Sequence, residues 1–225
     1  SAEGISEEGT KQDSLEFGLM KARLEVYYEN IPANSLRLFE SKVDDSPSDA
    51  NIYGLALAHK KNNNFAKSIN LLDKLIQKYP KNLVINTTKV DILLSYDKFN
   101  EALDLVNQFL EISPKNYPLS ISKSKVLLAM ERYFESEEII RDQLLRKNDD
   151  PELWLLLSEI QRNSQNIIGY HQSRAEYFLL LGQDDKALNQ LEFALQLTQN
   201  NFQVSESLMN KIVEIKKNLS SARGL

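Results

Sequence analysis

The sequence predicts an all-α fold, an α-α superhelix or solenoid of about twelve antiparallel helices that ends in a C-terminal capping helix. The first observation is a step of 34 residues that separates Pro80 from Pro114. The second is the spacing of apolar residues between these prolines, which recur every three or four positions as on one side of a helix. The third is a small residue midway along each step, at Ser68 and Ala102.

A step of this length, with a small residue in the middle and a proline at the end, is typical of the tetratricopeptide (TPR) helix-turn-helix repeat. We expect a single TPR array over residues 14–219, with repeats at about 16–48, 49–82, 83–116, 117–150 and 151–199 and a capping helix over 202–219. Residues 1–13 are polar and without period, so we expect a disordered or tag-derived segment there. Residues 220–225 are expected to form a flexible tail.

The first repeat is degenerate. Apolar residues recur at helical spacing from residue 14 until Pro32 ends the run, and a second stripe follows with Leu36, Phe39 and Val43. Ser35 takes the place of the small residue. An irregular unit suits the end of an array, because a terminal repeat has a neighbour on one side only.

The next three repeats keep the 34-residue step. Ala56 and Ser68 have the limited bulk that lets the two helices of a hairpin approach closely. The third repeat departs at Lys89, whose aliphatic stem can still cover apolar surface. In the fourth, Pro118 suits the first turn of a helix, and no proline closes the repeat, since position 148 is Asn148.

The segment beyond Asn148 allows two alignments. Asp150 can cap a helix that begins at Pro151 and contains Trp154, which would open a fifth repeat. The stretch around Gly182 and Ala187 also aligns as a repeat of its own. We therefore expect one helix, from about residue 167 to 181, to serve both units, with Gly182 at its C-terminal end and Asp184 or Asp185 capping the next helix.

The last predicted helix covers residues 202–219. We expect one side to pack on the final hairpin and the other to face water, as in a capping helix. The predicted apolar side consists of Val204, Leu208, Ile212, Val213 and Ile215.

Composition gives no support for a nucleic-acid or membrane protein. The formal net charge is −5, no cysteine is present, and the apolar runs are far shorter than the ~20 residues of a spanning helix. No secretory signal opens the sequence, although an excised fragment would look the same. We therefore expect no transmembrane segment, no disulfide and no thiolate metal site.

The sequence also lacks the motifs of an enzyme. His59 and His171 stand far apart, and neither belongs to an HExxH motif, so we expect His59 to be a packed structural residue. Phosphate-binding and nucleophile motifs are missing. Acidic pairs such as Asp184-Asp185 are expected at helix starts and on exposed faces. The prediction is a chain without catalytic residues, cofactor or metal.

A TPR array presents a concave surface formed largely by the first helix of each hairpin. Apolar and charged side chains alternate at the inward positions, which suits an extended peptide or a helix of a partner protein. The predicted concave surface consists of Tyr53, Leu57, Lys60, Val84, Thr87, Asp91, Leu94, Ile121, Lys125 and Leu128.

Seven lysines and only one acid, Asp73, lie between Lys60 and Lys89. This stretch could attract an acidic partner or an anionic membrane. We favour a solvated lysine face instead, since charge runs on helical repeats commonly serve solubility. Nucleic acid is not expected, because no aromatic residues are interleaved as a base-stacking platform requires.

A narrower resemblance rests on LMKARLEVY near the start and on GYHQSRAEYFLLLGQDDKALNQLEFALQLTQNNFQVS near the end. The second stretch looks like the C-terminal TPR domain of bacterial periplasmic zinc metallopeptidases of the β-barrel assembly-enhancing protease type, and the first resembles the segment that follows the protease domain in that family. The most specific part is not demanded by the repeat. It contains Tyr170, His171, Arg174, Glu176 and Tyr177.

The resemblance implies a Gram-negative periplasmic protein in which an HExxH protease precedes this chain, and zinc is expected only in that missing domain. It also implies that the array recruits substrates or partners, with the outer-membrane barrel-assembly machinery and unfolded outer-membrane proteins as the expected ones. A free-standing scaffold of an envelope assembly or secretion system is the alternative. A cytosolic chaperone adaptor is disfavoured, since Lys60, Asn86 and Lys125 make no convincing carboxylate clamp.

Overall fold

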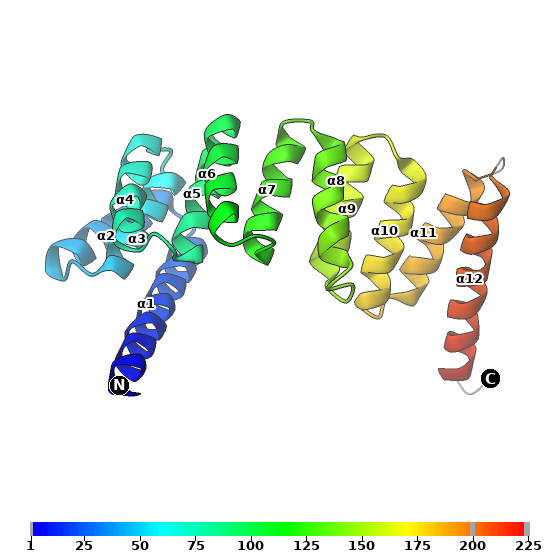
Figure 1. The fold of residues 1–225 in the computed structure, drawn as a ribbon, viewed down its shortest axis with the longest axis horizontal. Coiled ribbons are helices and arrows are strands. Elements are labelled where there is room, and N and C mark those ends of the chain that lie inside the picture. Colours follow the sequence, from blue (N-terminus) through cyan, green and yellow to red (C-terminus); the bar gives the residue numbers. More distant parts are fainter. Residues whose placement is uncertain (1, 199–200, 223–225) are drawn as a thin grey trace. The chain divides into compact units, whose positions relative to one another are not determined.

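The structure is a computed structural model that describes the backbone of residues 2–198 and 201–222 and the side chains of residues 14–198 and 201–221. In these ranges the chain forms twelve α-helices and no strand, which confirms the predicted all-α fold. The helices fall into two compact units, Ser1–Pro114 and Lys115–Leu225. Figure 1 shows the succession of helices along the chain.

Unit 1 contains six helices, in which α1 and α2 both pack on α3, and α3 to α5 each pack on the next helix. They are α1 (Ala2–Tyr28), α2 (Pro32–Asp45), α3 (Asp49–Lys61), α4 (Phe65–Lys78), α5 (Leu83–Ser95) and α6 (Phe99–Ile112). The core is continuous from α1 to α5 and includes the fully buried Leu19, Phe39, Tyr53 and Leu72. Helices α1 and α2 both pack on α3, and their assignment to one degenerate first repeat stays a prediction.

Unit 2 contains the other six helices. They are α7 (Tyr117–Ala129), α8 (Tyr133–Leu144), α9 (Pro151–Asn163), α10 (Ile167–Leu180), α11 (Asp184–Gln196) and α12 (Phe202–Ala222). One buried cluster joins α8 to α9 and includes Ile140 and Leu153. A second joins α10, α11 and α12 and includes Leu191 and Leu208.

The 34-residue step has a direct structural basis in the turns between paired helices. Asn63, Asp97, Glu131 and Gln165 stand 34 residues apart, and all have positive φ. A residue in this left-handed conformation lets the next N–H bond to a carbonyl five residues back, which ends the helix. The bonds run from Asn64 to His59 (2.9 Å), Lys98 to Leu93 (2.9 Å), Arg132 to Leu127 (2.9 Å) and Asn166 to Gln161 (2.8 Å). The period therefore survives where the closing proline is lost.

The same turn occurs once more after only 17 residues. Gly182 has a φ of +67°, and the N–H of Gln183 bonds to the carbonyl of Phe178 at 2.9 Å. Helix α10 packs against both α9 and α11, which confirms the prediction of one helix that serves two units. The predicted cap was wrong, since α11 begins at Asp184 after Gln183, which makes no side-chain capping bond.

Small residues allow the hairpins to close, as predicted. The Ser68 hydroxyl donates to the carbonyl of Ala56 across the α3–α4 pair at 2.7 Å. Ser136 makes the equivalent bond to the carbonyl of Ser124 across α7 and α8 at 2.8 Å. All four residues are fully buried, so a larger side chain at any of them would push the two helices apart.

Helix α12 packs on α11, with Leu208, Ile212 and Ile215 buried. Val213 was placed on the packed side, and this was wrong, because its side chain is 65 % exposed. It follows Ile212 by about 100° around the helix and so points away from the core.

Three of the predicted domain bounds stay predictions. They are the single array over residues 14–219, the disordered or tag-derived start at 1–13 and the tail at 220–225. The side chains of 1–13 and 222–225 lie outside the described residues.

Candidate interaction surface

A polar network links three successive first helices in unit 1. Arg23 on α1 donates from Nε and Nη2 to the hydroxyl of Tyr53 on α3, at 3.0 and 2.6 Å. The same Nη2 donates to Oγ1 of Thr88 on α5 at 2.6 Å, and the Tyr53 and Thr88 hydroxyls lie 2.9 Å apart. The network ties the three helices together with directional bonds, which makes their relative positions more rigid.

Tyr53 was predicted to face a ligand, and its position corrects that prediction. The side chain is fully buried, and its hydroxyl is held by Arg23 and Thr88. It therefore supports the surface from below. The network was not predicted from the sequence, because its residues do not recur at the 34-residue step of the repeat.

The other predicted positions of unit 1 lie on α3 and α5. Leu57 is half-buried and Lys60 exposed on α3. On α5, the half-buried Val84, Thr87 and Leu94 and the exposed Asp91 follow one another at one-turn spacings. This set of six residues, supported by Tyr53, is called the α3–α5 face below.

The remaining three predicted positions belong to α7 in unit 2. Ile121 and Leu128 are half-buried and pack against the cluster that contains Ile140 and Leu153. Lys125 is exposed. A large part of the apolar surface of Ile121 and Leu128 is thus occupied by contacts within unit 2.

The Tyr170 to Tyr177 segment lies on α10, where several of its side chains contact α11 and α12. Nδ1 of His171 lies 2.9 Å from Oε1 of Gln190 on α11. The His171 ring contacts the rings of Tyr170 and Phe193, with centroids 4.9 and 5.6 Å away. Glu176 forms an ion pair with Lys211 on α12.

Arg174 lies on the same helix beside two aromatic rings. Its guanidinium carbon is 4.8 Å from the Phe178 ring centroid and 5.7 Å from that of Tyr177. Its Nε is buried and has no hydrogen-bond partner. These contacts make the segment a packing centre for the end of unit 2.

His59 is buried on α3, as expected for a structural residue, and its Nδ1 has no hydrogen-bond partner. Burial lowers the pKa of His59, and the Lys67 ammonium lowers it further against the opposing effect of Glu40. Among the described residues, no group of three histidine or acidic side chains could hold a metal ion.

Asp150 caps α9 and is itself held by its neighbours. Its Oδ1 accepts from the N–H of Glu152 at 2.9 Å, while Oδ2 accepts from Lys147 at 2.9 Å and from the Tyr117 hydroxyl. Burial raises the pKa of Asp150, but the bonds from Tyr117, Lys147 and the Glu152 N–H outweigh it and leave that pKa below its ordinary value. The predicted cap is confirmed.

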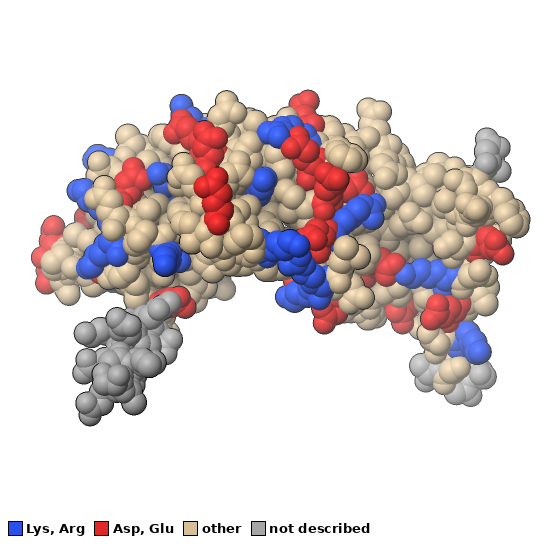
Figure 2. Space-filling view, in the orientation of Figure 1, with Lys and Arg blue, Asp and Glu red and all other residues tan. Residues whose placement is uncertain are grey.

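Three of the seven lysines between Lys60 and Lys89 make contacts inside unit 1. Lys61 donates to the last carbonyls of α1, including that of Val26 at 2.6 Å. Lys78 and Lys89 pair with Asp49 and Asp73, each at 2.6 Å. In Figure 2, positive and negative side chains are interspersed on the visible face.

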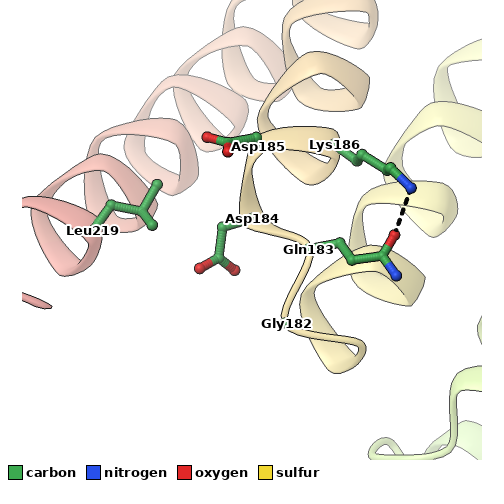
Figure 3. A pocket seen from close by; sticks show the side chains of 6 residues that line it. All are labelled: Gly182, Gln183, Asp184, Asp185, Lys186 and Leu219. Atoms are coloured by element: carbon green, nitrogen blue, oxygen red, sulfur yellow. Dashed lines mark hydrogen bonds between the residues drawn. The ribbon is translucent and has the colours of Figure 1, made fainter. Parts of the chain in front are cut away.

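An open pocket of about 350 Å³ lies at the α10–α11 turn (Figure 3). Its lining consists of Gly182, Gln183, Asp184, Asp185, Lys186 and Leu219. Lys186 donates to Gln183 at 2.9 Å. The carboxylates and the single apolar side chain form no converging set of ligand groups, so the pocket indicates no specific ligand.

Comparison with known proteins supports the repeat architecture. Residues 93–160 match the tetratricopeptide repeat family. The fold is that of a TPR-like helical solenoid. No curated protein matches the chain.

In the described part of the chain, no helix combines the length and the hydropathy of a membrane-spanning segment.

Several solved structures share this fold at low sequence identity. A double mutant of MamA RS-1 is 11 % identical, with a TM-score of 0.53 over 77 % of this chain and 97 % of that one. MamA from Desulfovibrio magneticus RS-1 is 10 % identical, with a TM-score of 0.50 over 82 % and 96 %. A thermophilic TPR protein of Thermus thermophilus is 17 % identical, with a TM-score of 0.49 over 88 % and 99 %. The first two support the fold alone.

Proposed function

We propose that this chain is a non-catalytic interaction module that binds an extended peptide or a helix of a partner protein on its α3–α5 face. TPR-like solenoids are scaffolds for protein–protein interaction. The observation that carries the proposal is the alternation of half-buried apolar and exposed charged side chains along α3 and α5. An apolar anchor such as Leu94 would supply affinity, while Lys60 would contribute to register.

The network of Arg23, Tyr53 and Thr88 supports the same proposal. It fixes the first helices of unit 1 before a partner arrives. A surface that is already ordered loses less conformational entropy on binding, which favours affinity.

Site-specific photocrosslinking tests the position of the surface. A photoreactive amino acid at Lys60 on α3 is expected to crosslink proteins from a Gram-negative envelope extract. The same group at Lys74 on α4 is the matched control, since both lysines are exposed and both belong to unit 1. Equal crosslinking from the two positions, or crosslinking from Lys74 alone, would refute the assignment to the α3–α5 face.

We further propose that the module recruits partners or substrates to a periplasmic zinc metallopeptidase that acts in outer-membrane protein assembly and quality control. The resemblance of the segment from Tyr170 to Tyr177 supports this. The expected partners are the barrel-assembly machinery and unfolded outer-membrane proteins, and zinc would belong to a protease domain outside this chain. No nucleic acid partner is expected.

Two experiments separate this proposal from a free-standing envelope scaffold. The intact gene is expected to encode an HExxH domain in frame before Leu15 and a signal peptide before that domain. Pull-down from envelope extracts is expected to capture assembly factors or outer-membrane proteins. Envelope capture without the upstream domain would favour the scaffold, and capture of cytosolic proteins alone would contradict both.

A further inference from the structure

The outer side of α1 carries a line of exposed apolar side chains. The opposite side packs on α3 through the buried Leu19, Ala22 and Val26. The exposed residues, called the α1 stripe, are 43 to 74 % accessible. The α1 stripe consists of Phe17, Met20, Leu24 and Tyr27, and Ile31 continues its spacing just beyond the helix.

The spacing of the α1 stripe is that of a coiled-coil seam. Its residues follow one another by three, four and three positions, which are the a and d positions of a heptad. A helix that only closes an array needs a polar outer face. Large apolar groups in one line on such a face indicate a partner helix.

We propose that the α1 stripe pairs with the α1 stripe of a second copy of this chain, in a parallel two-stranded coiled coil. Glu16 and Lys21 flank the stripe on opposite sides, at the g and e positions. In a parallel pair in register, Glu16 of each copy lies beside Lys21 of the other. The complementary charges therefore occur twice in the dimer.

The opposite orientation is disfavoured by the same residues. An antiparallel pair centred on the α1 stripe places Lys21 beside Lys21 of the second copy, which repel each other. Glu16 and Lys21 are both exposed, and no ion pair among the described side chains engages either. By contrast, Glu25 already pairs with Lys42 on α2.

Helix α3 leaves the α1 stripe uncovered. The stripe lies on the side of α1 opposite the buried residues that pack on α3, so this contact does not occupy it. The seam spans only two heptads, and short interfaces are weak. We expect a dissociation constant on the order of 100 µM.

Sedimentation equilibrium of the whole chain tests the association. The wild type is expected to dimerise with rising concentration, and Phe17→Glu to remain monomeric. Phe134→Glu is the matched control, since Phe134 on α8 is 74 % exposed and Phe17 is 73 % exposed. A wild type that stays monomeric up to about ten times the expected dissociation constant, or equal effects of the two variants, would overturn the proposal.

A charge-reversal cycle tests the contact between the two copies. Glu16→Lys and Lys21→Glu should each weaken dimerisation about tenfold, which corresponds to 1.4 kcal/mol. The double variant should recover the wild-type constant, because the pairs are complementary again. A double variant as weak as the single ones would overturn the parallel register.

Crosslinking tests the orientation directly, since the chain contains no cysteine. Under mild copper-catalysed oxidation, Phe17→Cys should form a disulfide with its own equivalent in the second copy. A mixture of the Phe17→Cys and Tyr27→Cys variants tests the opposite orientation. In an antiparallel dimer, the Phe17→Cys variant would form a disulfide with the Tyr27→Cys variant instead. That mixed product, without the Phe17→Cys homodimer, would overturn the parallel arrangement.

Discussion

Helix α3 approaches Phe39 of α2 closely at Gly54, and this contact predicts an unusual effect of substitution. A β-carbon added at Gly54 would lie 2.0 Å from Cε1 of Phe39, 2.4 Å from Cδ1 and 2.6 Å from Cζ. Non-bonded carbon atoms are most stable about 3.5 to 4.0 Å apart. The Phe39 ring would therefore have to move by roughly 1.5 Å.

The ring has little freedom to move. Phe39 is fully buried in the core of unit 1, and overpacking of such a core costs about 1 to 3 kcal/mol, occasionally more. Replacement of a helical glycine by alanine alone would stabilise by about 1 kcal/mol. A clash of this size should outweigh that gain, so we expect Gly54→Ala to lower the free energy of unfolding by about 1 to 2 kcal/mol.

Urea denaturation followed by circular dichroism measures this difference. Phe39→Leu provides the control, since a smaller side chain relieves the clash at Gly54. In the double variant, the alanine should cost at least about 1 kcal/mol less than in the wild type, which is a coupling expected for residues in contact. A Gly54→Ala protein that is more stable than the wild type would refute the reasoning.

Three further predictions concern charged or titratable groups. Lys61→Met should reduce the free energy of unfolding by about 1 to 2 kcal/mol, because the ammonium no longer holds the end of α1. Lys60→Met is the control at an exposed site and should change this free energy by less than about 0.5 kcal/mol. Urea denaturation measures both differences. Asp150→Asn should lower stability at neutral pH, because the pKa of Asp150 is lowered in the folded state and its charged form stabilises the fold. In a pH series of melting curves, the difference from the wild type should shrink as the pH falls below 3.8. A constant difference at all pH values would contradict that origin. The pKa of His59 is also lowered in the folded state, so the unfolded state binds more protons and stability should fall as the pH drops below 6.5. His59→Gln should make stability depend less on pH in this range. An unchanged pH dependence would exclude His59 as its source.

The fold was predictable because the repeat is set by local interactions. The left-handed residue of the turn recurs at the 34-residue step from Asn63 to Gln165, and the small residue at the helix crossing recurs at this step from Ser68 to Ser136. Asn63 and Asp97 illustrate this, since asparagine and aspartate tolerate positive φ better than most residues. Five turns therefore keep one geometry even without the closing prolines.

The candidate interaction surface was less predictable because it depends on contacts between repeats. Tyr53 was assigned to the surface from its position within the repeat, yet its hydroxyl is bonded to Arg23 and Thr88 from two other repeats. Val213 was misplaced for a related reason, since a short stretch of apolar residues does not show which side of α12 lies against α11. Both errors arise where helical spacing alone leaves the neighbour undefined.

Helix α10 shows how one helix can serve two hairpins. A helix of an ordinary hairpin needs small residues on the single side where its partner approaches. On α10, Gly169 and Ser173 face α9, where an added β-carbon at Gly169 would lie 2.9 Å from Nε2 of Gln161 and the Ser173 hydroxyl donates to Oε1 of Gln161 at 2.7 Å. Ala175 is buried in the same cluster as Ala187 of α11. The larger side chains of His171 and Glu176 on α10 contact Gln190 of α11 and Lys211 of α12. The segment that resembles the metallopeptidase family therefore lies on the helix that packs against both α9 and α11.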